Sequence, residues 1–559
     1  MHLVPAALLT LAAASASPAA DDTKSRVDAV FREYDRSDSP GCALGVYRDG
    51  KIVYERGYGM ANLELGVANA PQTVFDIGST AKQFTAFSIH LLAREGKLSL
   101  DDDIRKWVPE IPSYGKTITI RHLLHHTSGL RDYIETMALQ GVQEADWTTD
   151  EEALAAIARQ KALNFAPGEE YLYSNTGYFL LSVVVRRASG QSLRDFSQAR
   201  IFGPLGMRHT QFDESHSRII PNRATGYSKG DGGGFEIDMG NWEQNGDGGL
   251  QTTVEDLQLW DQNFYEPKVG DRALLDEMLT VGVLNDGKKI GYASALAPGR
   301  YRGLPTVSHG GAWVGYRAQL LRFPEQRFSV ACLCNLAEAN PTTLAHGVAE
   351  IYLSALLKPL EVPKPASKSA SVKVSASGLQ RLVGAYREAS SFEVFTLEVK
   401  QGQLEGTWGR QTIRLIPTAP GRYRLEGFSD AARDVEVVGG MPGARPALRL
   451  SYLDDGLFLV TEMFEPVTLW SPNAAELASF AGRYTSEEVD TTWTLAVDGG
   501  RLFIRHRGLP EEPLRPTADG VFVVRGMVLA FQKDSAGNVT GFMVNEGRVR
   551  GIAFRKVPS

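Results

Sequence analysis

A long internal repeat restricts what the C-terminal part of this chain can fold into. Six residues recur at a constant offset of 98: Gly384, Tyr386, Leu397, Val399, Gly402 and Leu404 return as Gly482, Tyr484, Leu495, Val497, Gly500 and Leu502. A period near 100 residues exceeds the roughly 20 to 50 residues of solenoid repeats and indicates a duplicated domain. Gly and Pro break apolar runs about every 8 to 12 residues, which is typical of small β-barrels or sandwiches. The sequence therefore predicts two similar β domains.

A change of composition separates these β domains from the rest of the chain. Residues 359–378 read PLEVPKPASKSASVKVSASG, without a large aromatic residue or any periodicity, and this composition is typical of a linker. The chain before it is dense in apolar residues and contains every motif described below. We therefore predict a signal segment at 1–20, a first domain at 21–358, a linker at 359–378, and β domains at 379–471 and 472–559.

The first domain combines strand-like ends with a helical middle. Its opening GCALGVYRDGKIVYERGYG predicts two strands around an Asp49-Gly50 turn. Apolar residues over 84–91 follow a helical repeat, which Gly96 should end. Near the far end VSHGGAWVGY, RAQLLRF and RFSVACLCNL predict three more strands, followed by a helix over 345–356. One sheet should gather strands from both ends, so we predict an α+β fold.

The N-terminus has the pattern of an export signal. MHLVPAALLTLAAASASPAADD contains a short Leu- and Ala-rich segment that ends in small residues at 14–16, although His2 and the α-amino group supply its only positive charge. The alternative is an ordinary apolar N-terminus. No later stretch approaches the roughly 18 to 20 apolar residues that cross a bilayer. We therefore predict a periplasmic or secreted protein without a membrane span.

Charge and cysteine content exclude several classes of function. The 559 residues include 59 Lys and Arg against 66 Asp and Glu, a net charge of −7, so we do not expect nucleic-acid binding. Three cysteines cannot form a disulfide framework in so long a chain. Cys332 and Cys334 lie two apart in an apolar run, where they are typical strand side chains and an improbable metal site.

Ser79-Thr80-Ala81-Lys82 is the first candidate catalytic motif, at the start of the predicted helix. A serine hydroxyl is a weak nucleophile until a base takes its proton, and Lys82 lies on the same helical face three residues on. Free N–H groups at the helix start could also stabilise an oxyanion. The alternative is a helix-capping serine followed by a solvated lysine.

Tyr173-Ser174-Asn175, in APGEEYLYSNTGYFLLS, is the second motif. A tyrosine can act as a general base only where nearby cations favour its charged form, and Lys82 could supply that charge. The Asn175 amide could hold both Lys82 and a substrate carbonyl. The alternative is a buried tyrosine followed by a capping Ser-Asn pair.

His309-Gly310-Gly311-Ala312 is the third motif, inside a predicted strand. Two glycines weaken a strand unless something approaches its backbone closely, and an acyl substrate docked along that edge would do so. The Ala312 N–H could then complete an oxyanion hole with that of Ser79. The alternative is a β-bulge with a solvated histidine.

The order and spacing of these motifs resemble the serine β-lactamase and penicillin-binding-protein-like hydrolases. GSTAKQF, LLHHTSGL, APGEEYLYSNTGY, GDGGLQTTVEDL and SHGGAWVGY follow one another as in the class C-like branch, which includes esterases and D-aminopeptidases. The resemblance covers about residues 24–357. It implies an antiparallel sheet with helices on both faces plus an all-helical subdomain, followed here by two small β-barrel-like domains.

The resemblance also implies a role for each site residue. Ser79 would be the acylated nucleophile, Lys82 its base partner and Tyr173 the proton shuttle. Asn175 would orient the substrate, and His309 would stand where many members have the Lys of K-T-G. No cofactor and no metal are implied, because the histidines in LLHHTSGL belong to a structural loop near the site.

The histidine at 309 bears on the substrate. A lysine there pairs with the carboxylate of a penicillin or a peptide C-terminus, whereas histidine is mostly neutral near pH 7. We therefore predict a peptidase or amidase for small or D-residue-containing peptides, with a short-chain esterase as the alternative. A third hypothesis is a protein that binds cell-wall fragments without turnover. The expected partner is a small peptide, amide or ester.

Two further expectations concern the rest of the chain. The β domains should shape substrate access and be dispensable for the chemistry, with the Gly-rich segment 437–443 as a candidate loop near the site. The resemblance implies that the strand of Cys42 lies next to that of Cys332 and Cys334. We nevertheless predict three free thiols, because neighbouring strands seldom offer the separations that a disulfide needs.

Overall fold

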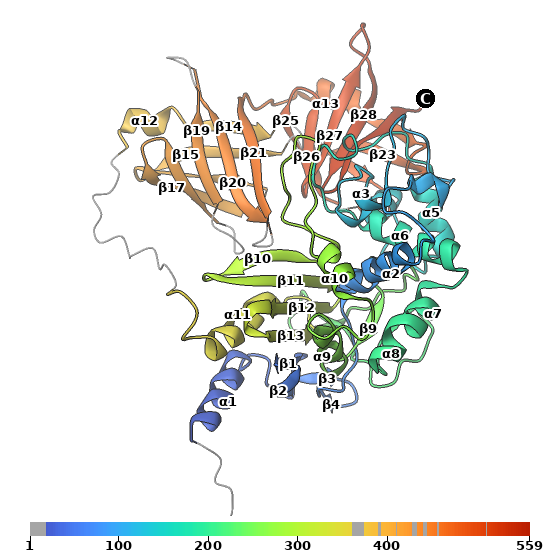
Figure 1. Cartoon of the computed structure of the whole chain (residues 1–559). Helices are drawn as coiled ribbons and strands as arrows, with labels where there is room; N and C mark the ends of the chain where they lie inside the picture. Colours follow the sequence, from blue (N-terminus) through green and yellow to red (C-terminus); the bar gives the residue numbers. More distant parts are fainter. Residues whose placement is uncertain are drawn as a thin grey trace, which may run out of the picture.

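The first domain is built on a six-stranded antiparallel sheet that joins its two ends. A computed structural model describes residues 18–359, 374–388, 393–409, 411–427, 433–439, 444–454, 458–509 and 511–558. The strands lie in the order β10, β11, β12, β13, β1, β2, as Figure 1 shows. Their bounds are β1 Cys42–Arg48, β2 Lys51–Tyr58, β10 Ala297–Tyr301, β11 Leu304–Trp313, β12 Tyr316–Phe323 and β13 Phe328–Cys334. Residues 1–17 of the predicted signal segment and 360–373 of the predicted linker lie outside the described residues.

The predicted hairpin and the three later strands are confirmed. Arg48 pairs with Lys51 across a turn in which Asp49 and Gly50 have φ of 50° and 72°, the left-handed backbone that a two-residue hairpin turn needs. β1 then pairs with β13, so strands almost 300 residues apart are neighbours, as Cys42 opposite Cys334 illustrates with a sequence separation of 292.

Helices cover both faces of this sheet. α1 (Pro18–Val30) and α11 (Pro341–Tyr352) bury apolar side chains on one face. α2 (Lys82–Arg94) and α9 (Val254–Asn263) contribute to the larger core on the other face. The remaining helices and turns of the domain are η1 Gly78–Ala81, η2 Ile104–Lys106, α3 Ile120–Leu124, α4 Tyr133–Gln140, α5 Asp150–Ala158, α6 Asn175–Ser189, α7 Leu193–Ser197, η3 Gln198–Phe202, α8 Gly203–Leu205, α10 Arg272–Met278 and η4 Pro324–Gln326. Most of these form the helical subdomain that the resemblance implied.

Seven short strands complete the first domain. They are β3 Met60–Asn62, β4 Val67–Ala68, β5 Phe75–Asp76, β6 Gln211–Phe212, β7 Tyr227–Lys229, β8 Phe235–Ile237 and β9 Leu250–Thr252. β5, β9 and β6 form a three-stranded sheet that leads into η1. Within the described residues, the structure has no helix with both the length and the apolar character needed to cross a bilayer.

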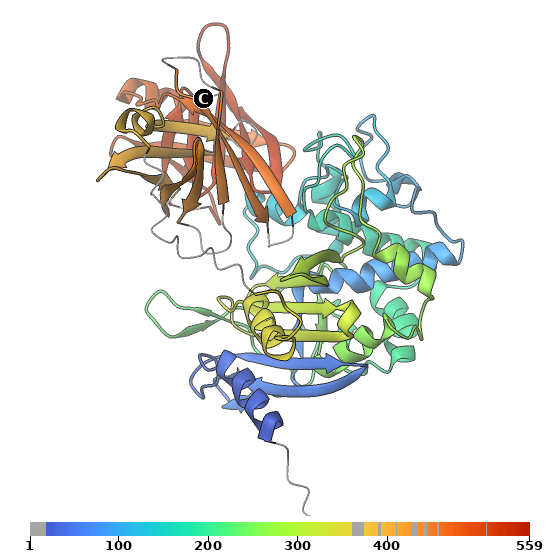
Figure 2. The same ribbon diagram turned by 60° about the vertical axis from the view of Figure 1, so that its left-hand side comes forward.

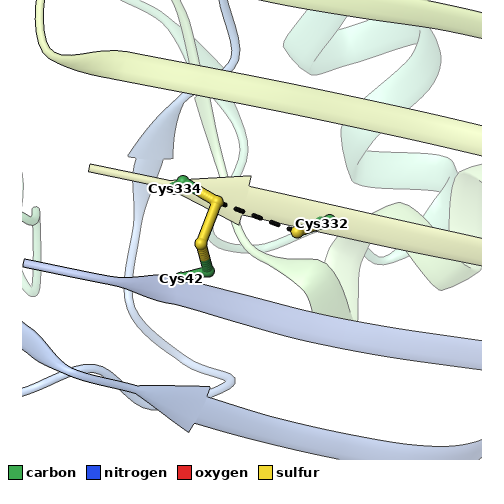
Figure 3. Close-up of side chains that lie close together, drawn as sticks. All are labelled: Cys42, Cys332 and Cys334. Atoms are coloured by element: carbon green, nitrogen blue, oxygen red, sulfur yellow. Dashed lines mark hydrogen bonds between the residues drawn. A yellow bond between two sulfur atoms is a disulfide. The ribbon is translucent and has the colours of Figure 1, made fainter. Parts of the chain in front are cut away.

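The prediction of three free thiols is wrong. Cys42 and Cys334 form a disulfide, and only Cys332 keeps a free thiol. The pairing of β1 with β13 places Cys42 directly opposite Cys334, whereas Cys332 lies two residues further along β13 with its Sγ 3.7 Å from Cys334 Sγ (Figure 3). The prediction that the strands of Cys42 and Cys334 are neighbours is confirmed. The prediction of free thiols failed because adjacency alone does not specify the register, and the observed register places these two residues opposite each other.

Thiol counting tests this disulfide. We expect one alkylated cysteine, Cys332, when the protein is denatured without reductant, and three after reduction. Mass spectrometry of the labelled chain gives both numbers. Three labels without reductant would contradict the disulfide and restore the sequence-based expectation.

Two closed eight-stranded barrels follow the first domain. The first consists of β14 Gly384–Glu388, β15 Val394–Lys400, β16 Gln403–Trp408, β17 Gln411–Ala419, β18 Arg422–Glu426, β19 Arg433–Val438, β20 Ala447–Asp454 and β21 Phe458–Val467. The second consists of β22 Gly482–Ser486, β23 Thr491–Asp498, β24 Arg501–Arg505, β25 Pro513–Ala518, β26 Val521–Val524, β27 Met527–Lys533, β28 Val539–Glu546 and β29 Val549–Lys556. Both views place the barrels together beyond the β10 edge of the main sheet (Figures 1 and 2).

The repeat in the sequence is a repeat in strand pairing. Gly384 pairs with Leu397 in the first barrel as Gly482 pairs with Leu495 in the second. Tyr386 and Tyr484 are both fully buried, each in the core of its own barrel. A short helix precedes each barrel, α12 (Ala376–Gln380) and α13 (Ala474–Phe480). The predicted duplication into two β domains therefore has a structural counterpart.

The second barrel is docked on the helical subdomain by buried contacts. Arg131 Nη1 and Glu488 Oε2 lie 2.5 Å apart, with side chains only 2% and 7% exposed. Leu139 of α4 belongs to the apolar core of the barrel, and Trp493 Nε1 donates to the Leu139 backbone oxygen at 3.1 Å. Of the candidate loop 437–443, residues 440–443 lie outside the described residues.

Candidate active site

Ser79 lies at the entrance to a buried helix. The one-turn helix η1 carries it, and α2 begins three residues later at Lys82. Gly78 has a φ of 48°, and a Cβ at this position would lie 2.6 Å from the Ala312 nitrogen. Glycine is needed here for both reasons. The Ala312 N–H of β11 is thereby placed beside the residue that precedes Ser79.

The buried Lys82 ammonium is surrounded by three oxygen atoms. Nζ donates to Ser79 Oγ at 2.9 Å, to Asn175 Oδ1 at 2.9 Å and to the Asp247 backbone oxygen at 2.5 Å. An ammonium group has three N–H donors, so these acceptors use all of them. As the three-residue spacing predicted, Lys82 reaches Ser79.

Tyr173 lies beside this ammonium, in the extended segment before α6. Lys82 Nζ is 5.0 Å from the centroid of its ring, and the His126 ring packs against it with centroids 4.1 Å apart. Tyr173 Oη is buried and has no hydrogen-bond partner among the described residues. Most buried polar groups have a hydrogen-bond partner, and a catalytic role is one explanation for a hydroxyl that lacks one.

Asn175 links Lys82 to the start of α4. Its Oδ1 accepts from Lys82, and its backbone N–H donates to Asp132 Oδ2 at 2.7 Å. The other oxygen of Asp132 caps α4 by accepting from the Ile134 nitrogen at 3.0 Å. The fully buried Asp132 therefore holds Asn175 in position, a role that no sequence motif indicated.

His309 is neutral and has both ring nitrogens occupied. Nδ1 lies 2.6 Å from the Gly310 carbonyl oxygen, which can only accept, so Nδ1 carries the proton. Nε2 then accepts from Tyr292 Oη at 2.8 Å. Burial lowers the pKa of His309 to about 4, so the ring stays uncharged at neutral pH. The sequence predicted a mostly neutral histidine, and the structure adds that it has no free donor.

The glycines after His309 allow β11 to lie directly against η1. A Cβ on Gly311 would lie only 1.9 Å from the Ile77 backbone oxygen. The prediction of a close backbone approach is confirmed, although the approaching group is the protein's own segment before Ser79. Ala312 is exposed to the cavity that also borders Ser79.

Asp247 is a site residue that the sequence analysis missed. Its backbone oxygen accepts from Lys82, and its Oδ2 accepts from Tyr133 Oη at 3.1 Å. Burial raises the pKa of its carboxyl to about 6, although the Lys82 charge acts in the opposite direction. The only available signal was its place in GDGGLQTT, which contributed to the family resemblance and to no chemical assignment.

Arg548 is a second missed residue, and it comes from the second barrel. The turn between β28 and β29 brings its guanidinium carbon to 4.8 Å from the Tyr173 ring centroid. Its Nη1 is 3.9 Å from Asp132 Oδ2. Arg548 follows the linker in sequence, so the second barrel contacts the site. The prediction that the β domains are dispensable for the chemistry did not anticipate this contact. Nothing in the local sequence of this turn distinguishes it from an ordinary strand connection.

One large cavity joins these groups. It has a volume of about 2310 Å³, and its lining includes Ser79, Tyr173, Asn175, His309 and Arg548. The first barrel borders it through residues such as Glu462. A substrate in this cavity would contact the first domain and both barrels.

His122, just before LLHHTSGL, and His126 within it have separate structural roles. His122 Nδ1 accepts from the Thr119 nitrogen at 3.1 Å within the capping box of α3. His126 Nδ1 accepts from the Ser174 nitrogen at 3.2 Å and supports the Tyr173 ring. Among the described residues, the one group with metal-like spacing is Cys42, Cys332 and Cys334, two of which form the disulfide.

Comparison with known proteins gives a consistent picture. Residues 27–353 match the Beta-lactamase family. Penicillin-binding protein 4* of Bacillus subtilis is 29% identical over 417 residues, which cover 68% of this chain and 86% of that protein. A D-aminopeptidase of Cereibacter sphaeroides is 28% identical over 492 residues, 87% of this chain and 88% of that enzyme.

A solved structure with a similar fold is the octameric penicillin-binding protein homologue from Pyrococcus abyssi. It is 25% identical, with a TM-score of 0.56, and the match covers 80% of this chain and 99% of that one. The similarity to the D-aminopeptidase extends well beyond residue 353, so it includes sequence of the two barrels as well as the first domain.

Proposed function

This chain belongs to the Beta-lactamase family, and we propose that it is a serine hydrolase that cleaves amide bonds of small or D-residue-containing peptides through an acyl-enzyme. One observation carries the proposal: the buried Lys82 ammonium contacts Ser79 Oγ and Asn175 Oδ1 beside the Tyr173 hydroxyl, which has no hydrogen-bond partner among the described residues. A nucleophile and a proton acceptor thus border one cavity, with a fixed cation buried beside both.

Tyr173 is the group that takes the proton of Ser79. The Lys82 ammonium already donates to Ser79 Oγ, so it cannot accept the serine proton while charged. Tyr173 accepts it as Ser79 Oγ bonds to the substrate carbonyl carbon and the carbonyl π pair moves to oxygen. The Ser79 and Ala312 N–H groups stabilise that oxyanion. When the oxyanion re-forms the carbonyl, the C–N bond breaks and Tyr173 gives the proton to the leaving amine. A water molecule then gives its proton to Tyr173 and bonds to the acyl carbon, the Ser79 Oγ–carbon bond breaks, and Ser79 takes that proton as the acid is released.

The state of His309 supports cleavage from the amino end of a substrate. A neutral ring with both nitrogens engaged offers neither a positive charge nor a free donor to a substrate carboxylate. Position 309 would therefore contribute little to holding the carboxylate of a penicillin or a peptide C-terminus. The 28% identity to a D-aminopeptidase over 87% of this chain supports the same substrate class.

A substrate panel tests the proposal. We expect D-amino acid p-nitroanilides with a free α-amine to be hydrolysed faster than their L-forms and faster than N-acetylated derivatives. Ser79→Ala, tested in parallel, should hydrolyse none of them. Turnover of p-nitrophenyl esters alone would replace the amidase by the esterase. If no substrate is turned over and a fluorophosphonate leaves no adduct on the chain, the site binds ligands without catalysis.

We also propose a periplasmic or secreted location. The apolar N-terminal segment with small residues at 14–16 supports export. The disulfide between Cys42 and Cys334 supports it independently, because structural disulfides persist mainly in oxidising compartments.

A further inference from the structure

Tyr173 has two cations close to its ring, and they come from different domains. Lys82 Nζ of α2 lies 5.0 Å from the ring centroid, and the Arg548 guanidinium of the second barrel lies 4.8 Å from it. The other titratable neighbours of the ring include His126, His309, Tyr178 and Tyr292. Burial lowers the pKa of His126 and of His309, so neither ring is charged near neutral pH. Lys82 and Arg548 are therefore the two positive charges that face Tyr173 among the described residues.

The position of Arg548 is fixed through the backbone of its turn. Its N–H donates to Glu135 Oε2 at 2.5 Å, and its carbonyl oxygen accepts from Asn164 Nδ2 at 2.8 Å. Asn164 Oδ1 accepts in turn from the Arg550 nitrogen at 2.9 Å. These contacts join the backbone around Arg548 to the first domain, and from this backbone the side chain reaches the Tyr173 ring.

The Arg548 side chain and the backbone of Asn175 both lie against the carboxylate of Asp132. Its Nη1 lies 3.9 Å from Asp132 Oδ2, the atom that accepts the Asn175 N–H. Asp132 thus faces both Arg548 and the segment that holds Lys82. Glu135 is the other acidic group beside Arg548. Glu135 contacts the backbone N–H of Arg548, and burial raises the pKa of its carboxyl to about 8, so Asp132 is the carboxylate that lies beside the guanidinium.

We propose that Arg548 is a positioning residue for catalysis, supplying the second positive charge that stabilises Tyr173 when its oxygen is negative. The step is the one proposed above: the Tyr173 phenolate takes the Ser79 proton as the Ser79 Oγ–carbon bond forms. Two cations within about 5 Å of the ring favour the phenolate that must exist before this transfer. The second barrel is then part of the catalytic machinery. The inference rests on the proposed role of Tyr173.

Substitution of Arg548 in the full-length protein tests this role. We expect Arg548→Ala to lower kcat by about 2- to 5-fold, with KM little changed, since a cation beside a ring is worth about 0.5–1 kcal/mol where solvent reaches it, and the Arg548 side chain is 40% exposed. Arg548→Lys should keep part of the activity, and added guanidinium should partly restore Arg548→Ala.

The matched control is Arg550→Ala. Arg550 lies two residues after Arg548, in β29, and its side chain forms an ion pair with Glu170 at 3.0 Å instead of facing Tyr173. We expect this variant to keep the wild-type kcat. Sodium chloride at the ionic strength of the added guanidinium should not restore Arg548→Ala.

Three outcomes would overturn the inference. An unchanged kcat in Arg548→Ala shows that the second charge is not needed. A fall in kcat that neither guanidinium nor the Arg548→Lys substitution restores assigns Arg548 a purely structural role through Asp132. A rise in KM alone makes it a substrate-binding residue. In all three cases Ser79→Ala would still be inactive, so the proposed function would stand while the role of Arg548 fails.

Discussion

Replacing Ser79 by alanine is expected to lower kcat/KM by at least about 1,000-fold and to abolish covalent labelling by a fluorophosphonate. The reason is that the bond-forming oxygen is lost while the buried contacts around it remain. Lys82→Met should have an effect of similar size, because it removes the ammonium beside both Ser79 Oγ and the Tyr173 ring. Kinetics on the best substrate of the panel and intact-mass spectrometry measure both effects, with circular dichroism to check folding.

Ser88→Ala is the matched control for these variants. Ser88 is a buried serine of α2, the helix that follows Ser79, and its Oγ donates to the Phe84 backbone oxygen at 2.8 Å within the helix. We expect near-normal turnover and labelling. Near-normal turnover in Ser79→Ala or Lys82→Met, in contrast, would remove the proposed nucleophile or its cation from the mechanism.

Replacing Glu488 by alanine is expected to destabilise the folded protein by about 3–5 kcal/mol and to reduce turnover at least 10-fold. The change leaves the Arg131 guanidinium, 2% exposed, without its carboxylate partner at the interface of the second barrel. Glu488 Oε2 also accepts from the Lys161 backbone nitrogen at 2.9 Å. The substitution therefore removes both the ion pair with Arg131 and this hydrogen bond from the contact between the two domains. Thermal unfolding followed by circular dichroism measures the stability, and the substrate panel measures turnover.

Glu487→Ala is the control at the neighbouring position. Glu487 forms ion pairs with Lys161 and Arg555 on the surface, where the exposed side chains gain little from pairing. Its melting temperature should be almost unchanged. If Glu488→Ala is equally harmless, the buried ion pair does not hold the barrel in place.

Truncation of the chain after Lys358 removes both barrels, and with them the whole interface to the first domain. The sequence alone suggested that such a domain would still be acylated by a small ester. The structure leads us to expect a loss of turnover at least as large as in Arg548→Ala, because both Arg548 and the barrel core around Leu139 are removed. Full activity of the truncated domain would show that neither barrel contributes to the chemistry.

The sequence by itself determined features that depend on local spacing. The Asp49-Gly50 pair predicted the β1–β2 hairpin because few other residues adopt the backbone of that turn. Ser79 and Lys82, three apart, predicted a shared helical face. The offset of 98 residues predicted two similar β domains because duplicated sequences keep the same strand pairing. Each of these inferences needs only a few neighbouring residues or a comparison of the chain with itself.

Only the tertiary structure decided which distant residues meet. The register of β1 against β13 placed Cys42 opposite Cys334, and a shift by one residue would have turned the two thiols to opposite faces. The proton on His309 follows from a carbonyl and a tyrosine that fold against it. Arg548, 375 residues after Tyr173, reaches the Tyr173 ring because buried contacts dock the second barrel on the helical subdomain. Contacts of this kind depend on register, packing and domain docking, and no local pattern in the sequence encodes them.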